Sequence, residues 1–168
     1  MTMRISDLTK NAVERLLDYN PETGRFVWKI NTKGARAGRE AGVIVRDGYR
    51  RISINRRHYF AHCIAMLLMT GEWPTTEIDH IDGIPSNNTW TNLRMASRKQ
   101  NGRNRKINRN NTSGFKGVSW SSKAAKWQTG IMVDGRSIYL GSYWDIRNAA
   151  AAYNKAAHKY FGEFSRGA

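Results

Sequence analysis

Residues 109–114, Arg-Asn-Asn-Thr-Ser-Gly, divide the 168-residue chain into two stretches that would fold around separate cores. None of these six side chains is apolar, and Asn, Ser, Thr and Gly are typical of loops. The segment therefore predicts a linker between two small modules, residues 1–108 and 112–168. Each module is small enough that its core alone leaves a limited margin of stability.

The first module has the pattern of a mixed α and β layer. Apolar residues recur at helical spacing near its start, and Asp47-Gly48 between two apolar runs is typical of a tight hairpin turn. A second apolar run ends at Gly71 and Pro74, which predicts the end of a buried helix. The predicted elements are a helix at 6–18 with Ser6 as N-cap, a turn at 20–24, a strand at 25–30, a loop at 31–40, hairpin strands at 43–45 and 49–54, a turn at 55–57 and a helix at 59–69.

The second module predicts a three-stranded antiparallel sheet covered by one helix. Asp134-Gly135 predicts the tight turn between the second and third strands. Residues 144–161 predict an alanine-rich helix that lies close to the sheet, because alanine side chains are small. The strands are expected at residues 115–120, 126–133 and 136–141. Together the modules give an α+β protein.

The sign of the charge restricts the partners of the chain. Lys and Arg number 28 against 13 Asp and Glu, a formal net charge of +15. Such a field attracts polyanions, so nucleic acid, an anionic membrane surface and an acidic protein are the candidates. The longest apolar run, residues 61–69, is too short to span a bilayer, and the first residues lack the apolar core of a signal peptide. Because Cys63 is the only cysteine, disulfide frameworks and Cys-rich zinc sites are excluded. A soluble cytoplasmic protein that binds nucleic acid is expected.

The residues that carry chemistry lie between positions 78 and 104. Hydrolysis of a phosphodiester bond needs a base to activate water and a divalent metal to neutralise charge on the phosphate. His80 supplies a base, and Asp79 beside it supplies the hard oxygen ligand that Mg²⁺ prefers. A strand, a loop and a following helix would bring Asn92 and Asn101 back towards His80.

Asp79-His80, Asn92-Leu93-Arg94 and Asn101 resemble the motif of HNH nucleases in its Asp-His/Asn/Asn form, which phage-encoded homing endonucleases carry. The resemblance implies a ββα-metal fold in which Asp79 and Asn101 hold one Mg²⁺ or Mn²⁺. It also implies that His80 is the general base and that Asn92 holds the His80 loop by hydrogen bonds. Many members have His in place of Asn101, and the zinc-binding cysteines of some relatives are absent, so no structural zinc is expected. An origin in a phage or mobile element, acting inside a bacterial host cell, is implied by this resemblance alone.

The second module resembles AP2/ERF DNA-binding domains. The matching residues are 113–118 (Ser-Gly-Phe-Lys-Gly-Val), Lys126-Trp127, 140–143 (Leu-Gly-Ser-Tyr) and 149–153 (Ala-Ala-Ala-Ala-Tyr). That family places its sheet in the major groove of DNA. The resemblance assigns these groove-facing positions: Lys116, Ser119, Ser121, Lys123, Met132, Ser137 and Tyr139. Arg136, at the tip of the predicted hairpin, is expected to contact the DNA backbone.

A basic run without an acidic partner follows the HNH-like motif. Residues 97 to about 108 predict a basic helix with Ser97 as N-cap. Such a run is either a solvated helix face or a set of phosphate contacts, and its position beside a nuclease motif favours the contacts, which position DNA without reading sequence. The residues are Arg94, Arg98, Lys99, Arg103, Arg105, Lys106 and Arg109.

Other side chains near the motif have structural interpretations. Asp82 is expected to be a turn residue before Gly83 rather than a second metal ligand, and Asn87 and Asn88 are expected to shape the loop rather than to act in catalysis. His62 is expected to pack in the core with a local hydrogen bond. Among the aromatic residues, Trp127 is expected under the terminal helix, whereas Trp120 is a candidate for stacking on bases.

The sequence thus predicts metal-dependent hydrolysis of phosphodiester bonds in double-stranded DNA, leaving 5′-phosphate and 3′-hydroxyl ends. The enzyme would act as a monomer or homodimer, and one site per chain would nick one strand. Two alternatives stay open: a non-catalytic DNA-binding regulator that uses the AP2-like sheet, and an RNA-binding protein.

Overall fold

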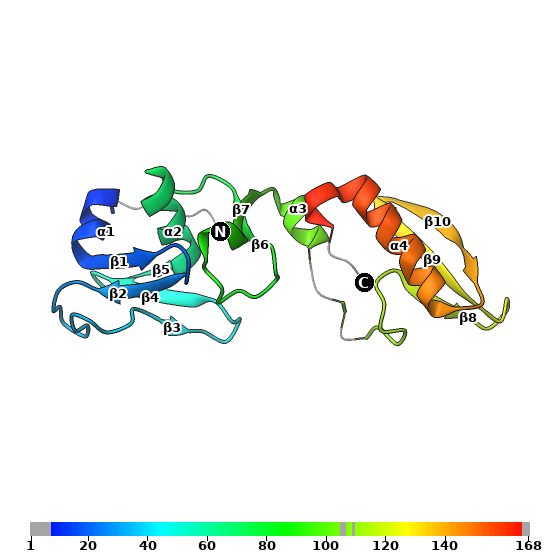
Figure 1. Cartoon of the computed structure of the whole chain (residues 1–168), viewed down its shortest axis with the longest axis horizontal. Helices are drawn as coiled ribbons and strands as arrows, with labels where there is room; N and C mark the ends of the chain where they lie inside the picture. Colours follow the sequence, from blue (N-terminus) through cyan, green and yellow to red (C-terminus); the bar gives the residue numbers. More distant parts are fainter. Residues whose placement is uncertain (1–7, 105–106, 109, 166–168) are drawn as a thin grey trace. The chain divides into compact units, whose positions relative to one another are not determined.

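The computed structural model describes residues 8–104, 107–108 and 110–165, and its contacts divide the chain into two compact units (Figure 1). The first unit is Met1–Arg98 and the second is Lys99–Ala168. Both mix helices and strands, so the predicted α+β class is confirmed. None of the helices in the described ranges is both long enough and apolar enough to cross a membrane.

The first unit is built from three small antiparallel sheets and two helices. A short hairpin, β1–β2, and a three-stranded sheet in the order β3-β4-β5 pack with α1 and α2 around one core, and β6 pairs with β7. Fully buried side chains of this core include Val13, Phe26, Ile52 and Ile64. The elements are α1 (Lys10–Leu16), β1 (Leu17–Asn20), β2 (Arg25–Trp28), β3 (Val43–Ile44), β4 (Arg50–Ile54), β5 (Arg57–Phe60), α2 (Ala61–Thr70), β6 (Glu77–His80), the 3-10 turn η1 (Trp90–Asn92) and β7 (Leu93–Ala96).

Two predicted helices of this unit give up residues to strands. The first helix was expected to run to residue 18, but Leu17 pairs with Trp28 across β1–β2 and is buried there. The second was expected to start at residue 59, but Tyr59 pairs with Ile52, and the helix starts at Ala61. In both cases sheet pairing outweighs helical spacing. Thr9 caps α1 by accepting from the Ala12 amide, and the predicted cap Ser6 lies outside the described residues.

The second unit contains the three strands and the helix expected from its sequence. The sheet has the order β10-β9-β8 and α4 covers one of its faces, where Ala149, Tyr153, Ala156 and other residues are buried (Figure 1). The elements are α3 (Arg98–Arg103), which begins at the last residue of the first unit, β8 (Val118–Ser121), β9 (Lys126–Val133), β10 (Arg136–Tyr143), α4 (Ile146–Phe161) and the 3-10 turn η2 (Gly162–Phe164).

Helix α3 is shorter than predicted and contacts the C-terminal sheet. It ends at Arg103 rather than near residue 108. Lys99 forms an ion pair with Asp134 in the β9–β10 turn, and Lys116 donates to the Arg103 carbonyl. These contacts place most of α3 in the second unit. The boundary between the two units therefore lies after Arg98, before the polar segment 109–114.

Candidate active site

A strand, a loop and a second strand position the residues of the predicted motif. In the β6–β7 pairing, Asp79 lies opposite Arg94 and His80 opposite Leu93. The loop between them starts directly after His80 and returns through η1 to Asn92. Asp79 and His80 are buried, with 3% and 5% of their surface exposed. Because both are polar, the surrounding groups must satisfy them by hydrogen bonds or ion pairs.

The Asn92 side chain ties the two ends of this loop together. Its amide oxygen accepts from the Asp82 backbone N–H at 2.9 Å, and its amide nitrogen donates to Asp82 Oδ1 at 3.0 Å and to the Asn87 carbonyl at 2.9 Å. The amide therefore uses its acceptor and both donor hydrogens on the loop itself. These bonds hold β6 and β7 in a fixed position relative to each other.

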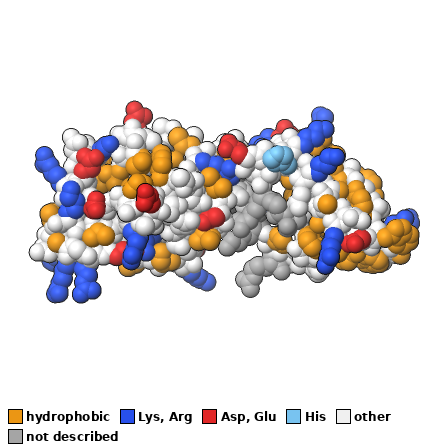
Figure 2. All heavy atoms as spheres, in the orientation of Figure 1, with side chains coloured by type: hydrophobic (Ala, Val, Ile, Leu, Met, Phe, Trp, Pro, Cys, Tyr) orange, Lys and Arg blue, Asp and Glu red, His pale blue; other side chains and the backbone are white. Residues whose placement is uncertain are grey.

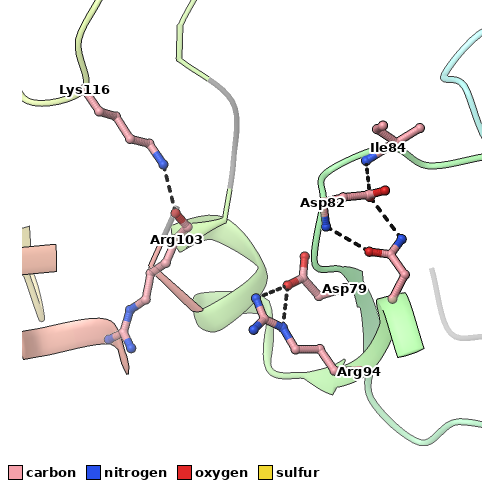
Figure 3. A network of polar contacts seen from close by, with 7 residues as sticks. Asp79, Asp82, Ile84, Arg94, Arg103 and Lys116 are labelled. Carbon is pink, nitrogen blue, oxygen red and sulfur yellow. Dashed lines mark hydrogen bonds and ion pairs between the residues drawn. The ribbon is translucent and has the colours of Figure 1, made fainter. Parts of the chain in front are cut away.

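Asp82 has the turn role expected of it. Its carboxylate accepts from the Ile84 backbone N–H at 2.8 Å and from Asn87 Nδ2 at 2.7 Å (Figure 3). Burial acts to raise the pKa of Asp82, but the hydrogen bonds from Asn87, Ile84 and Asn92 outweigh it and lower the pKa. The carboxylate is therefore ionised at neutral pH, and both of its oxygens accept hydrogen bonds from residues of the loop.

The His80 ring is oriented by Asn88. Asn88 is almost fully buried, and its Oδ1 lies 3.3 Å from His80 Nε2 while its Nδ2 donates to the Ser86 carbonyl. Because an amide oxygen only accepts, this contact places the ring hydrogen on Nε2 and the basic lone pair on Nδ1. Burial lowers the pKa of His80, opposed by the Asn88 hydrogen bond and the charges of Asp82 and Asp79. The ring is neutral at neutral pH, which is the form that accepts a proton.

An aromatic group, Tyr49, Phe60 and His62, surrounds the His80 ring. The His62 and Tyr49 ring centroids lie 5.1 and 5.9 Å from that of His80, and Phe60 stacks on His62 at 5.4 Å. Burial and the nearby His80 lower the pKa of His62 to about 3. His62 packs in the core as predicted. Its Nδ1, however, has no hydrogen-bond partner within the part of the chain that is described, so the predicted local hydrogen bond is wrong for this nitrogen.

Asp79 forms an ion pair with Arg94, which corrects the prediction of a basic run without an acidic partner. Arg94 donates to Asp79 Oδ2 from Nε at 2.8 Å and from Nη2 at 2.6 Å (Figure 3). The two side chains come from paired positions of β6 and β7. Arg94 is therefore committed to the carboxylate in this structure rather than to solvent.

The remaining basic residues of the run divide between paired and exposed positions. Lys99 and Arg103 lie 2.5 and 3.5 Å from Asp134 Oδ1, so these two also have an acidic partner. Arg98 is exposed at the start of α3, whereas Arg105, Lys106 and Arg109 lie outside the described residues. Asn101 is half-buried on α3, in the second unit, while Asp79, His80 and Asn92 share the first.

Five of the seven predicted groove-facing residues lie on the sheet face that α4 leaves open. Met132 and Tyr139 have 60% and 64% of their surface exposed, and the Tyr139 hydroxyl contacts Ser142 Oγ at 2.7 Å. Strand alternation puts Ser119, Ser121 and Ser137 on this same face. Lys123 is exposed in the β8–β9 turn and Arg136 is exposed at the start of β10, but Lys116 is half-buried and bonded to the Arg103 carbonyl. Trp127 packs beneath α4 as predicted, and Trp120 is half exposed beside it.

The donor chemistry at Asp79 suits a hard divalent cation. Its carboxylate is buried and anionic oxygen is the ligand type that Mg²⁺ prefers. Across the described ranges, no group of three or more His, Cys, Asp and Glu side chains is placed to hold a metal. A cation here would therefore take few protein ligands, as Mg²⁺ commonly does, and would share the Asp79 carboxylate with Arg94.

Sequence reasoning missed part of the surroundings of His80. It treated Asn88 as a loop residue, yet Asn88 also contacts His80, and it gave Tyr49 no role. The consecutive amides Asn87-Asn88 inside a loop after Asp-His were the available signal for Asn88. Tyr49 gave no local signal, because only the fold brings the β3–β4 hairpin to His80.

Comparisons with known proteins identify the family of the chain. A family model described as HNH endonuclease matches residues 59–103, which include Asp79, His80, Asn92 and Asn101. Protein 3.8 of Escherichia phage T7 is 37% identical over 89 residues, 53% of this chain and 73% of that protein. The Uncharacterized HNH endonuclease L560 of Acanthamoeba polyphaga mimivirus is 28% identical over 150 residues, 89% of this chain and 70% of that protein. A solved structure described as "DNA binding and cleavage by the HNH homing endonuclease I-HmuI" has a TM-score of 0.43 and 21% identity, covering 95% of this chain and 91% of that one.

Proposed function

Because the chain belongs to the HNH endonuclease family, we propose that it hydrolyses phosphodiester bonds in double-stranded DNA, with His80 as the general base and a divalent cation as cofactor. One observation carries the proposal. His80 is buried, its ring is held by Asn88, and burial lowers its pKa, so the ring is fixed and in the neutral form that can accept a proton. The net charge of +15 favours a polyanionic substrate.

In the proposed reaction, His80 removes a proton from the attacking water, the resulting hydroxide forms a bond to phosphorus, and the bond from phosphorus to the 3′ oxygen breaks. The 3′ oxygen then takes up a proton from solvent. The products would carry 5′-phosphate and 3′-hydroxyl ends. Asn92 keeps the base in place through the loop, and Asn88 keeps the ring in the tautomer that accepts a proton. Asp79 would hold Mg²⁺ or Mn²⁺, with Asn101 as the second ligand that the motif implies, and the cation would supply positive charge to stabilise the phosphate.

The open face of the C-terminal sheet is the proposed DNA-reading surface, in an arrangement like that of AP2/ERF domains. Its exposed Met132 and Tyr139, its serines and the neighbouring Lys123 and Arg136 offer apolar, hydroxyl and cationic contacts to a groove. Arg98 and the paired cations Lys99 and Arg103 are proposed phosphate contacts, the latter two after release from Asp134. A homing role in a phage or mobile element is part of this proposal and follows from the motif.

The test is nicking of supercoiled plasmid by the full chain with Mg²⁺ or Mn²⁺, with EDTA as the metal control. His80→Ala should lower the nicking rate by about 10²–10⁴-fold, the usual contribution of a general base, while duplex binding persists. His158→Ala, an exposed histidine on α4, is the matched control and should cut normally.

Two results would favour the alternatives. Binding without cutting, repeated on DNA from the source genome, would favour a non-catalytic regulator. Stronger binding to RNA than to duplex DNA in direct competition would favour an RNA-binding protein.

A further inference from the structure

Arg51 in β4 is a half-buried arginine for which the fold supplies no anion. Its Nε is buried without a hydrogen-bond partner, and within the described ranges no ion pair or hydrogen bond reaches its side chain. Its neighbours differ. Arg50 is paired with Glu40 at 2.9 Å, and Arg94 is paired with Asp79.

A guanidinium in this state is costly in the free protein. It is charged at every accessible pH, and removing one of its N–H groups from water without a partner carries a desolvation cost. Such a group is compensated when a ligand brings an anion to it. The planar fork of Arg fits the two oxygens of a phosphate especially well.

The position of Arg51 indicates which anion it would bind. Side chains alternate along β4, so Arg51 lies on the face opposite the buried Ile52, and its cross-strand partner is Phe60. Phe60 stacks on His62, which contacts His80. Tyr49, two residues before Arg51, contacts Phe60 and also lies beside the His80 ring. Arg51 is therefore connected to His80, the proposed general base, through a short series of neighbouring side chains, Phe60 and His62.

We propose that Arg51 binds a backbone phosphate of the DNA substrate at the edge of the active site. The inference rests on the proposed nuclease function and adds a binding residue from a strand outside the matched stretch 59–103. The excess of basic residues in the stretch of sequence around Arg51 also supports contact with a polyanion. Residues 25–57 contain ten Lys and Arg against only Glu40 and Asp47, and Figure 2 shows Lys and Arg side chains projecting from the end of the first unit where β2 and β3 lie.

The test compares Arg51→Gln with Arg56→Gln in the full chain. Both remove one positive charge from the same three-stranded sheet, but Arg56 is exposed in the β4–β5 turn. Two quantities are measured: the single-turnover nicking rate on supercoiled plasmid, and the Kd for a 30-base-pair duplex with EDTA, which needs no cleavage. Arg51→Gln should lose about tenfold or more in at least one of them, the size of a lost charged hydrogen bond, and Arg51→Lys should recover part of that loss. Arg56→Gln should lose less than about threefold, the share of a general charge effect.

Equal losses in the two Gln variants would overturn the proposal. A thermal melt without DNA adds an independent outcome. Arg51→Met keeps the apolar stem and removes the uncompensated charge, so its Tm should be equal to or above that of the wild type. A lowered Tm would show that the guanidinium stabilises the folded protein without DNA, which would contradict a role in phosphate binding. If the wild type binds duplex but cuts no DNA, the nuclease proposal fails while the Kd comparison still decides the role of Arg51. Should the wild type bind no DNA, both proposals fail.

Discussion

The β6–β7 loop and the open face of the C-terminal sheet both present polar side chains, but only the loop buries them. In the loop, Asp79, His80, Asn88 and Asn92 are each less than a tenth exposed and use their polar atoms on one another and on nearby backbone. On the sheet face, the polar residues Ser119, Ser137 and Tyr139 are exposed. A buried polar group needs a fixed partner, whereas an exposed one keeps its capacity for a ligand.

This difference means that the side chains of the β6–β7 loop are fixed before DNA binds, whereas those of the open sheet face can still change conformation. The loop has already lost the freedom of its side chains, so a reacting group is held in place without further cost on binding. The sheet face has kept side-chain freedom that DNA binding would remove, which costs affinity but lets one surface fit more than one groove shape. Changes to the loop should therefore alter the rate of cleavage, and changes to the second unit should alter affinity.

The largest expected effect comes from Gly24→Ala. Gly24 has φ +68°, and a Cβ there would lie 2.5 Å from backbone atoms of Asn88 and Thr89. The substitution should lower the unfolding free energy by about 2–4 kcal/mol through backbone strain and overpacking. Because Asn88 orients His80, the nicking rate should also fall by at least about tenfold. Urea unfolding and the plasmid assay measure the two effects.

Gly34→Ala is the control for this change. Gly34 also has positive φ, +93°, but nothing lies within 4 Å of the Cβ that alanine would add. Gly34→Ala should therefore lower the unfolding free energy through backbone strain but leave the nicking rate unchanged. If Gly24→Ala and Gly34→Ala had the same nicking rate, the loop would tolerate displacement and the preorganisation argument would fail.

Gly117→Ala applies the same test to the second unit. Gly117 has φ +65°, and an added Cβ would overlap the Tyr153 ring and lie 2.6 Å from the Gly130 carbonyl oxygen. The helix α4 should separate from its sheet at a cost of about 2–4 kcal/mol. Duplex affinity should fall severalfold, while the nicking rate at saturating enzyme stays near that of the wild type. Equilibrium binding and single-turnover nicking separate the two, with Gly114→Ala, which meets nothing within 4 Å, as control.

How much of this contrast could be predicted from the sequence depends on the separation of the residues in the chain. Asp79-His80 and Asn92 lie close together in sequence, so the resemblance of this short stretch to the HNH motif predicted them as one group. The strands of the second unit were equally local, with Asp134-Gly135 marking their turn. The ends of helices were not local. Leu17 belongs to a strand because Trp28 pairs with it, and no window of sequence around residue 17 contains that partner.

The surroundings of the site show the same limit. Tyr49 and His62 reach His80 only through the packing of the β3–β4 hairpin and α2. The pairs Arg94–Asp79 and Lys99–Asp134 join residues 15 and 35 positions apart, so the basic run had no visible partner in sequence. Electrostatic pairing depends on distance in space, which composition does not contain.

A smaller effect is expected from pH, through the buried His62. Its pKa is lowered to about 3 by burial, against about 6.5 in an unfolded chain. Between these values the unfolded state binds more protons, so stability falls as pH decreases below about 6.5. From pH 7 to pH 5 the unfolding free energy should drop by about 2 kcal/mol from this residue, and His80, whose pKa is also lowered, acts in the same direction.

His62→Phe isolates this contribution, because phenylalanine keeps the aromatic ring and does not titrate. Urea unfolding at pH 7 and pH 5 should show a difference about 2 kcal/mol smaller in the variant than in the wild type. His58→Phe, at an exposed position of β5, should leave the pH dependence as it is. An unchanged slope in His62→Phe would mean that His62 is not buried in its neutral form.

The smallest effect is expected at Asp134, where the second unit pairs its own cations. The Lys99 hydrogen bond and charge are the main causes that lower the pKa of Asp134, so its carboxylate is ionised at neutral pH. The pair with Lys99 is exposed on both sides, and such pairs add little to stability. Asp134→Asn should therefore leave Tm nearly unchanged. It should also tighten duplex binding by about two- to fourfold at low salt, because Lys99 and Arg103 become available to phosphate and the chain gains one net positive charge. Asp145→Asn would not report the charge change alone, because Asp145 caps α4; Glu72→Gln, at an exposed position of the first unit, is the control. A tightening in Asp134→Asn no larger than in Glu72→Gln would mean that Lys99 and Arg103 do not contact DNA, and the DNA-binding surface of the second unit would then be limited to its open sheet face.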